Sequence, residues 1–302
     1  MRRRHVFALG IVLVFTLQLL AQRGGFRDVA PEGSRVEYKT FTSKLLGRDL
    51  RYGIYLPPSY AGSASKKYPV LYFLHGLNEN EMRWSSRGLT DIKLDKMIAG
   101  GRIGEFIVAV PFGAVGFYTN KRNGSEPWED MIVSEFLPMI ESSYRVNASR
   151  ATRGIGGISM GGYGSLKIAM KHPDLFGSAS AHSAVLLANL ADARVSDRRL
   201  QMFQGLFDQI FGINQDMVYW DANNPLSLAA DTKKFNGLKI YFDCGTEDEY
   251  GFQTGTKLLD EMLTKAGYPH EGHLYPGNHG WDYALQHTDA SLLFHWKAFS
   301  GK

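Results

Sequence analysis

Residues 156–164 read Gly-Gly-Ile-Ser-Met-Gly-Gly-Tyr-Gly, and this glycine-rich segment separates two different sequence patterns. The segment before it, residues 151–158, is short and partly apolar, which is typical of a buried strand. After it, apolar residues between 166 and 170 recur at helical spacing. Ser159 is therefore expected where a strand turns directly into a helix, and residues 157–161 match the G-x-S-x-G pattern of a nucleophile elbow.

Steric crowding explains the glycines of this segment. A turn this sharp brings together the residues two before and two after the serine, so a Cβ at Gly157 or Gly161 would clash. The serine Oγ is then held out of the sheet, and the Met160 N–H directs a partial positive charge toward it. One alternative is a flexible Gly/Ser loop. The other is a dinucleotide-binding fingerprint beginning at Gly154, which fails because Ser159 occupies the position of its third glycine.

The composition describes a globular protein with a substantial core, because 44% of the 302 residues are hydrophobic and 13% are aromatic. This length allows one large α/β domain or two small ones. The formal charge of +4 depends largely on Arg2, Arg3 and Arg4, and without them it falls to +1. No basic stripe or stacking motif indicates a nucleic-acid partner.

The first 21 residues have the pattern of a secretory signal, with a basic start followed by a mostly apolar run at 6–21. That run is short for a membrane span, which needs about 20 residues. An uncleaved anchor is the alternative, because residues 19–21 are only a passable cleavage site. We expect a signal peptide at 1–21, a linker at 22–34, and a secreted or periplasmic protein without stable membrane contact after signal removal. Cys244 is the only cysteine, so an internal disulfide is excluded.

The remainder alternates between strand and helix patterns. Alternating residues at 35–42 and 49–56, separated by Gly47-Arg48, predict an antiparallel hairpin. Further strands are expected at 68–74, 105–111, 151–158, 176–181, 238–242 and 271–275, and helices at 89–99, 128–144, 252–265 and 281–299. This alternation predicts one domain at 35–302 with a mostly parallel sheet and helices on both faces. Residues at about 185–235 break the alternation and predict a helical insertion or lid, with a short helix starting at Asn224-Pro225.

Downstream acids and a histidine could activate the serine. A serine hydroxyl is a weak nucleophile at neutral pH and needs a base that is oriented by a carboxylate. Asp243, Glu247 and Asp248 follow the strand at 238–242, and His279 follows the strand at 271–275, at the same edge of the predicted sheet as Ser159. Asp243 is still strand-like and held by the pleat. We favour Asp248, which lies beyond a glycine turn and can reach the histidine, with Glu247 and Asp243 as alternatives.

His279 is the predicted base because glycines flank it on a loop, whereas His270 and His273 lie on or beside a strand. His182 follows another strand end, where it would line the pocket or, as we favour, have a structural role. Glu271 lies between His270 and His273 but does not form an H-E-x-x-H motif, and no other metal-ligand spacing occurs. The sequence therefore predicts no metal and no cofactor.

Two backbone N–H groups are the predicted oxyanion donors. One belongs to Met160, and the other to Leu77, in the loop that follows the strand at 68–74. The substrate pocket is expected to include Phe117 and Tyr118, from an aromatic loop at 112–128, and Trp281, which closely follows the predicted base.

Four motifs together resemble the esterase family of α/β-hydrolases. They are His75-Gly76 followed by Glu79 or Glu81 and Trp84; Gly157-Ile158-Ser159-Met160-Gly161-Gly162; Cys244-Gly245-Thr246-Glu247-Asp248; and Gly277-Asn278-His279-Gly280-Trp281. That family contains feruloyl and acetylxylan esterases, S-formylglutathione hydrolases, enterochelin esterases and mycolyltransferases. The resemblance covers about residues 35–300 and implies the α/β-hydrolase fold, with Ser159, Asp248 and His279 as nucleophile, acid and base. The motif around His279 departs from the Gly-His-Asp that is frequent in relatives, without changing the base itself.

The expected function is that of an exported serine esterase that hydrolyses a carboxylic ester through an acyl-enzyme. Its expected substrate is a small-molecule or polysaccharide ester of a carbohydrate, with a feruloyl or acetyl group. Export argues against the cytosolic S-formylglutathione hydrolases. The alternatives are an acyltransferase of the mycolyltransferase type, in which an alcohol replaces water, and a thioesterase similar to S-formylglutathione hydrolase. A non-catalytic binding protein is the alternative outside enzymes, and the complete triad argues against it.

Overall fold

The computed structural model describes residues 34–301, except 87, 189–197 and 214–215. The expected signal peptide and the linker up to residue 33 lie outside the described residues. Within the described part, no helix combines the length and apolar character needed to cross a membrane.

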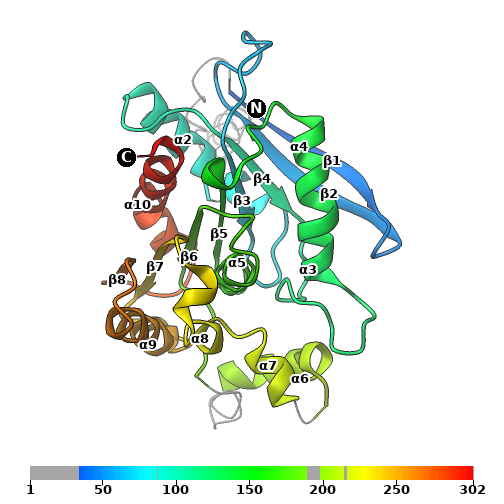
Figure 1. Ribbon diagram of the computed structural model, residues 1–302, viewed down its shortest axis with the longest axis vertical. Coiled ribbons are helices and arrows are strands. Elements are labelled where there is room, and N and C mark those ends of the chain that lie inside the picture. Colours follow the sequence, from blue (N-terminus) through cyan, green and yellow to red (C-terminus); the bar gives the residue numbers. More distant parts are fainter. Residues whose placement is uncertain (1–33, 87, 189–197, 214–215, 302) are drawn as a thin grey trace, which may run out of the picture. The chain divides into compact units, whose positions relative to one another are not determined.

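An eight-stranded sheet forms the centre of the fold, in the order β1-β2-β4-β3-β5-β6-β7-β8 (Figure 1). The strands are β1 (Arg35–Ser43), β2 (Arg48–Leu56), β3 (Val70–Leu74), β4 (Ile107–Pro111), β5 (Arg153–Ile158), β6 (Ser178–His182), β7 (Lys239–Gly245) and β8 (Glu271–Tyr275). The hairpin β1–β2 is antiparallel and joins β4 antiparallel, whereas all other neighbours are parallel. The predicted hairpin and mostly parallel sheet are therefore confirmed.

The central strands are buried on both faces, as expected from the apolar sequences of β3 and β4 and the partly apolar sequence of β5. Every residue of β3, β4 and β5 is buried. Because successive strand residues point to opposite faces, β3 directs Leu71 and Phe73 into one apolar cluster and Val70, Tyr72 and Leu74 into another.

Helices cover both faces of the sheet (Figure 1). The cluster on one face contains side chains from α1 (Arg83–Ser86), α2 (Thr90–Ala99) and α10 (Trp281–Ser300). The cluster on the other face contains side chains from α3 (Trp128–Asp130), η1 (Met131–Phe136), α4 (Leu137–Ser143), α5 (Met160–Lys171) and α9 (Phe252–Lys265). The single α-helix expected at 128–144 ends at Ser143 and contains a π-helical turn, η1, in its middle.

Further helices connect β6 to β7, where the sequence predicted an insertion. They are α6 (Arg198–Phe211), α7 (Met217–Asp221), α8 (Pro225–Leu228) and the 3₁₀-helix η4 (Thr232–Phe235). The Asn224 side chain accepts the Leu226 N–H at 3.2 Å and caps α8, with Pro225 at its first position, which confirms the predicted helix start. Aromatic side chains of α6 pack inward, and the ring of Phe211 lies 4.9 Å from that of Trp220.

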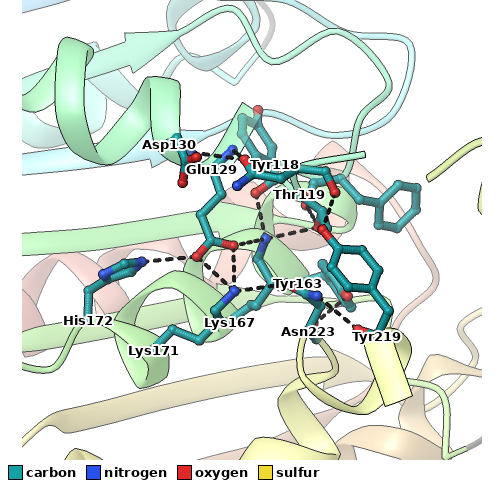
Figure 2. A network of polar contacts seen from close by, with 12 residues as sticks. Tyr118, Thr119, Glu129, Asp130, Tyr163, Lys167, Lys171, His172, Tyr219 and Asn223 are labelled. Atoms are coloured by element: carbon teal, nitrogen blue, oxygen red, sulfur yellow. Dashed lines mark hydrogen bonds and ion pairs between the residues drawn. The ribbon is translucent and has the colours of Figure 1, made fainter. Parts of the chain in front are cut away.

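A buried ion network connects helix α5 to α3 and to the loop at residues 112–127 that precedes α3 (Figure 2). The Lys167 ammonium donates to the Tyr118 carbonyl at 2.6 Å, the Thr119 hydroxyl at 2.9 Å and the Glu129 carboxylate at 2.8 Å. Burial lowers the pKa of Lys167 to about 8, against the opposing effect of Glu129. Burial alone would raise the pKa of Glu129, but the nearby cations, Lys167 foremost, hold it well below its usual range.

Candidate active site

Ser159 lies in a strained turn between β5 and α5. Its φ of 55° and ψ of −115° are uncommon for a residue other than glycine. A Cβ on Gly157 would lie 2.4 Å from the Gly161 backbone, and one on Gly161 would lie 1.9 Å from the Leu74 carbonyl oxygen. The steric need for glycine on both sides of the serine is therefore confirmed.

The structure brings Ser159, His279 and Asp248 into one chain of hydrogen bonds. His279 Nε2 lies 3.0 Å from Ser159 Oγ, and His279 Nδ1 lies 2.7 Å from Asp248 Oδ2. The Tyr250 N–H donates to Asp248 Oδ1 at 2.9 Å and fixes the carboxylate. With Nδ1–H donating to Asp248, Nε2 is left to accept the serine proton, which is the arrangement that makes a serine nucleophilic.

The other candidate acids have different partners. The Asp243 carboxylate lies 2.9 Å from His182 Nδ1 and accepts the Tyr241 hydroxyl at 2.7 Å. Glu247 is exposed. Of the three candidate acids, the side chain that contacts the His279 ring is that of Asp248, the acid favoured from the sequence.

The remaining histidines considered from the sequence lie in other contacts. His182 is buried, and its Nε2 lies 2.8 Å from Ser291 Oγ, so it has the structural place that we favoured. His270 pairs with Asp260 at 3.0 Å, and His273 packs against the ring of Tyr241.

The turn at residues 75–77 contains Leu77, one of the two predicted oxyanion donors. His75 Nε2 accepts the Gly113 N–H at 2.9 Å, and burial lowers the pKa of His75 to about 4, so the ring stays neutral and holds the turn. The Gly76 N–H donates to Glu79 at 3.0 Å. Leu77 follows and borders the same cleft as Ser159, while Met160 directly follows Ser159 as the first residue of α5. Both predicted donors thus belong to segments adjacent to the serine.

A cleft of about 210 Å³ opens above the serine. Trp281 lines it, as predicted, and its indole N–H donates to Glu79 at 2.6 Å. Sequence reasoning missed further lining residues, among them Arg83, Phe203 and Tyr250. The Tyr250 ring lies 4.9 Å from the His279 ring, and its place two residues after Asp248 was the available signal.

Phe117 and Tyr118 do not line this cleft, which corrects the prediction made from their loop. Both side chains are fully buried. The Phe117 ring packs 5.1 Å from that of Phe207 in the insertion, and the Tyr118 hydroxyl donates to the His75 carbonyl at 3.2 Å. The Phe117 ring turns inward because the insertion offers it an apolar surface, whereas the Tyr118 ring packs against His75 and supports the turn at residues 75–77.

Within the described ranges, no group of three or more His, Cys, Asp or Glu side chains has a geometry that could hold a metal ion. Cys244 lies next to Asp248, with its Sγ 3.4 Å from Asp248 Oδ2. Burial raises the pKa of this thiol, so it stays protonated and donates a weak hydrogen bond to the carboxylate.

Three comparisons relate this geometry to known proteins. The family model named Esterase, described as "Putative esterase", matches residues 43–289. Esterase Rv1288 of Mycobacterium tuberculosis is 28% identical over 270 residues, which cover 81% of this chain and 56% of that protein. An endo-1,4-beta-xylanase/feruloyl esterase of Xylanibacter ruminicola is 31% identical over 153 residues, or 47% of this chain and 20% of that protein. A solved ferulic acid esterase superposes with a TM-score of 0.77 at 25% identity, covering 89% of this chain and 99% of that one. The chain thus spans about half the length of the mycobacterial relative.

Proposed function

Because the chain belongs to the Esterase family of carboxylic-ester hydrolases, with the α/β-hydrolase fold, we propose that Ser159, His279 and Asp248 are its catalytic triad. The observation that carries this proposal is the continuous line of hydrogen bonds, 3.0 Å from serine to imidazole and 2.7 Å from imidazole to carboxylate. Both distances lie within the range needed for proton transfer.

The geometry supports a two-step mechanism. Ser159 Oγ attacks the ester carbonyl carbon while His279 Nε2 takes its proton, and Asp248 stabilises the imidazolium. The carbonyl oxygen becomes a negatively charged oxyanion, which the N–H groups of Leu77 and Met160 stabilise by donating hydrogen bonds. Collapse of this intermediate breaks the bond to the alcohol, which leaves with the proton from His279. Water then attacks the acyl-enzyme by the same route in reverse and releases the acid.

The proposed substrate is an ester of a carbohydrate with a feruloyl or acetyl group. Two of the compared proteins are named feruloyl or ferulic acid esterases. Aromatic side chains from Phe203, Tyr250 and Trp281 line the cleft, which suits a flat aromatic acyl group. Export, as the pattern of residues 1–21 suggests, would bring the enzyme to such polymers outside the cytoplasm.

The decisive experiment replaces the nucleophile. Ser159→Ala should lower kcat for p-nitrophenyl acetate on the order of 10⁶-fold and abolish labelling by a fluorophosphonate. Ser142→Ala is the matched control, because Ser142 is exposed on α4, outside the cleft lining. Retained turnover in Ser159→Ala, with the fold shown to be unchanged by circular dichroism, would refute the proposed triad. A screen of methyl ferulate, acetylated xylan and an acyl thioester then separates esterase from thioesterase, and transfer to an added alcohol identifies an acyltransferase.

A further inference from the structure

One carboxylate connects two loops of the site that are far apart in the chain. Glu79 lies in the loop between β3 and α1, two residues after Leu77. Its Oε1 accepts the indole N–H of Trp281 at 2.6 Å, and Trp281 lies two residues after His279. Its Oε2 accepts the Gly76 N–H at 3.0 Å. The Glu79 side chain therefore bonds both to the turn that contains a proposed oxyanion donor and to the loop that contains the proposed base.

The backbone and the side chain of Glu79 together close the turn around Leu77. The Glu79 N–H donates to the Gly76 carbonyl at 3.3 Å, and the Gly76 N–H donates back to the Glu79 carboxylate. Between them Asn78 has a φ of 60°, the left-handed conformation that some tight turns require at their third residue. Neither bond uses the Leu77 N–H, so the turn is closed without occupying the proposed oxyanion donor.

Trp281 holds the other loop at the start of α10. It is the first residue of that helix, and one residue, Gly280, separates it from His279. Its ring packs 6.3 Å from that of Phe73 in β3, and a Cβ on Gly88 would lie 2.5 Å from the indole. Because the indole is closely packed, a hydrogen bond to its N–H also fixes the backbone next to the proposed base.

The charge of Glu79 is needed as well as its shape. Three donors converge on it, namely the N–H groups of Gly76 and Trp281 and the Arg83 guanidinium, whose Nε lies 2.9 Å from Oε1. A carboxylate accepts at both oxygens, whereas a glutamine amide accepts at one end and donates at the other. A glutamine here would therefore place an NH₂ group against a donor on one side and release one of the two loops.

Both loops act on the same reaction intermediate. In the proposed mechanism the Leu77 N–H stabilises the oxyanion while the His279 imidazole holds the proton taken from the serine. The distance between these two groups must therefore match the geometry of the transition state. A misplacement of about 1 Å at such a site costs on the order of 100-fold in rate.

We propose, on the basis of the esterase activity proposed above, that Glu79 is a positioning residue for the reaction. It acts through Gly76 and Trp281 by setting the distance between the Leu77 N–H and the His279 imidazole, and it takes no part in bond making or proton transfer. Its removal should therefore slow the chemical step and weaken binding of the transition state, with little effect on binding of the substrate.

The test uses p-nitrophenyl acetate, because its small acyl group makes few contacts of its own. In Glu79→Gln, kcat should fall about 100-fold while KM changes by less than about threefold. Trp281→Phe keeps an aromatic ring but removes the N–H, and it should lower kcat about tenfold. The double variant should be no slower than Glu79→Gln alone, because both changes break the same connection.

A transition-state analogue and a neighbouring acid make the test specific. A boronic acid forms a tetrahedral adduct with the serine, and its inhibition should weaken in Glu79→Gln by about the same factor as kcat/KM. Glu81→Gln is the matched control, because Glu81 lies in the same loop but its carboxylate lies 3.1 Å from Arg51 Nε. It should keep kcat and lower the midpoint of unfolding.

Separate outcomes decide the positioning role and the proposed function. A kcat within about threefold of the unsubstituted enzyme in folded Glu79→Gln would overturn the positioning role, as would unchanged inhibition by the boronic acid or losses that multiply in the double variant. If circular dichroism shows Glu79→Gln to be unfolded, Trp281→Phe decides alone, and an unchanged kcat there would overturn the role. An unsubstituted protein that neither hydrolyses p-nitrophenyl acetate nor reacts with a fluorophosphonate would instead refute the esterase activity.

Discussion

Glu129→Gln should destabilise the protein strongly although it lies outside the cleft and changes almost no volume. The Glu129 side chain is 4% exposed, and its partner Lys167 is fully buried. The substitution leaves the ammonium with the Tyr118 carbonyl and the Thr119 hydroxyl but without a counter-charge. Removing one partner of a buried ion pair costs about 3–5 kcal/mol. Lys171 loses an ion pair as well, but its side chain is 29% exposed and contributes less.

Urea unfolding measures this cost. With a slope of about 2–3 kcal/mol per M, the midpoint should move down by about 1–2.5 M. Lys171→Met is the matched control and should cost about 1 kcal/mol or less. The double variant Glu129→Gln/Lys167→Met should recover much of the loss, because it leaves no buried charge without a partner. A loss below 1 kcal/mol in Glu129→Gln, or a double variant as unstable as the sum of its singles, would refute this account of the network.

Two further predictions concern the acids and the pH dependence. Asp248→Asn should lower kcat by about 10⁴-fold with p-nitrophenyl acetate, whereas Asp243→Asn should mainly lower the unfolding temperature; the reverse pattern would assign the orienting acid to Asp243. The pKa of Lys167 is about 8 in the folded protein, below its ordinary value of 10.5. Between pH 8 and 10.5 the unfolded chain therefore binds this proton more tightly than the folded protein does. Because of this group, the free energy of unfolding should rise as the pH increases from about 8 to 10.5. Lys167→Met should remove that rise, and an unchanged profile would contradict the placement of a charged amine in this site.

The parts of the site that depend on local signals could be predicted from the sequence. Continuous apolar runs marked the buried strands, and glycines marked the sharp turn at Ser159, because both signals depend on near neighbours in the chain. The position of Asp248 followed from the turn after β7, which frees a side chain from the pleat. The fold and the three residues of the proposed triad could be predicted for that reason.

Side chains placed by distant segments could not be predicted in this way. Phe117 and Tyr118 have the same sequence surroundings whether they point into the cleft or into the core. The direction of Phe117 is set by Phe207, in an insertion much later in the chain, and that of Tyr118 by His75, more than 40 residues earlier. Phe203 reaches the cleft from that insertion for the same reason. The sequence around Lys167 does not indicate that its charge is buried, because its ion-pair partner Glu129 lies 38 residues away in the chain.

The strained backbone of Ser159 depends on polar contacts at both sides of the turn. A positive φ in a residue with a side chain costs about 1–3 kcal/mol and persists only where surrounding contacts hold it. On the side of β6, the Ser159 N–H donates to the His182 carbonyl at 2.9 Å, and Asp243 fixes the His182 ring. On the other side, Lys167 anchors the helix that the serine begins. Asp243, within β7, therefore acts on the proposed nucleophile through His182, whereas Asp248 bonds the His279 imidazole and Glu249 accepts the His279 backbone N–H at 2.8 Å.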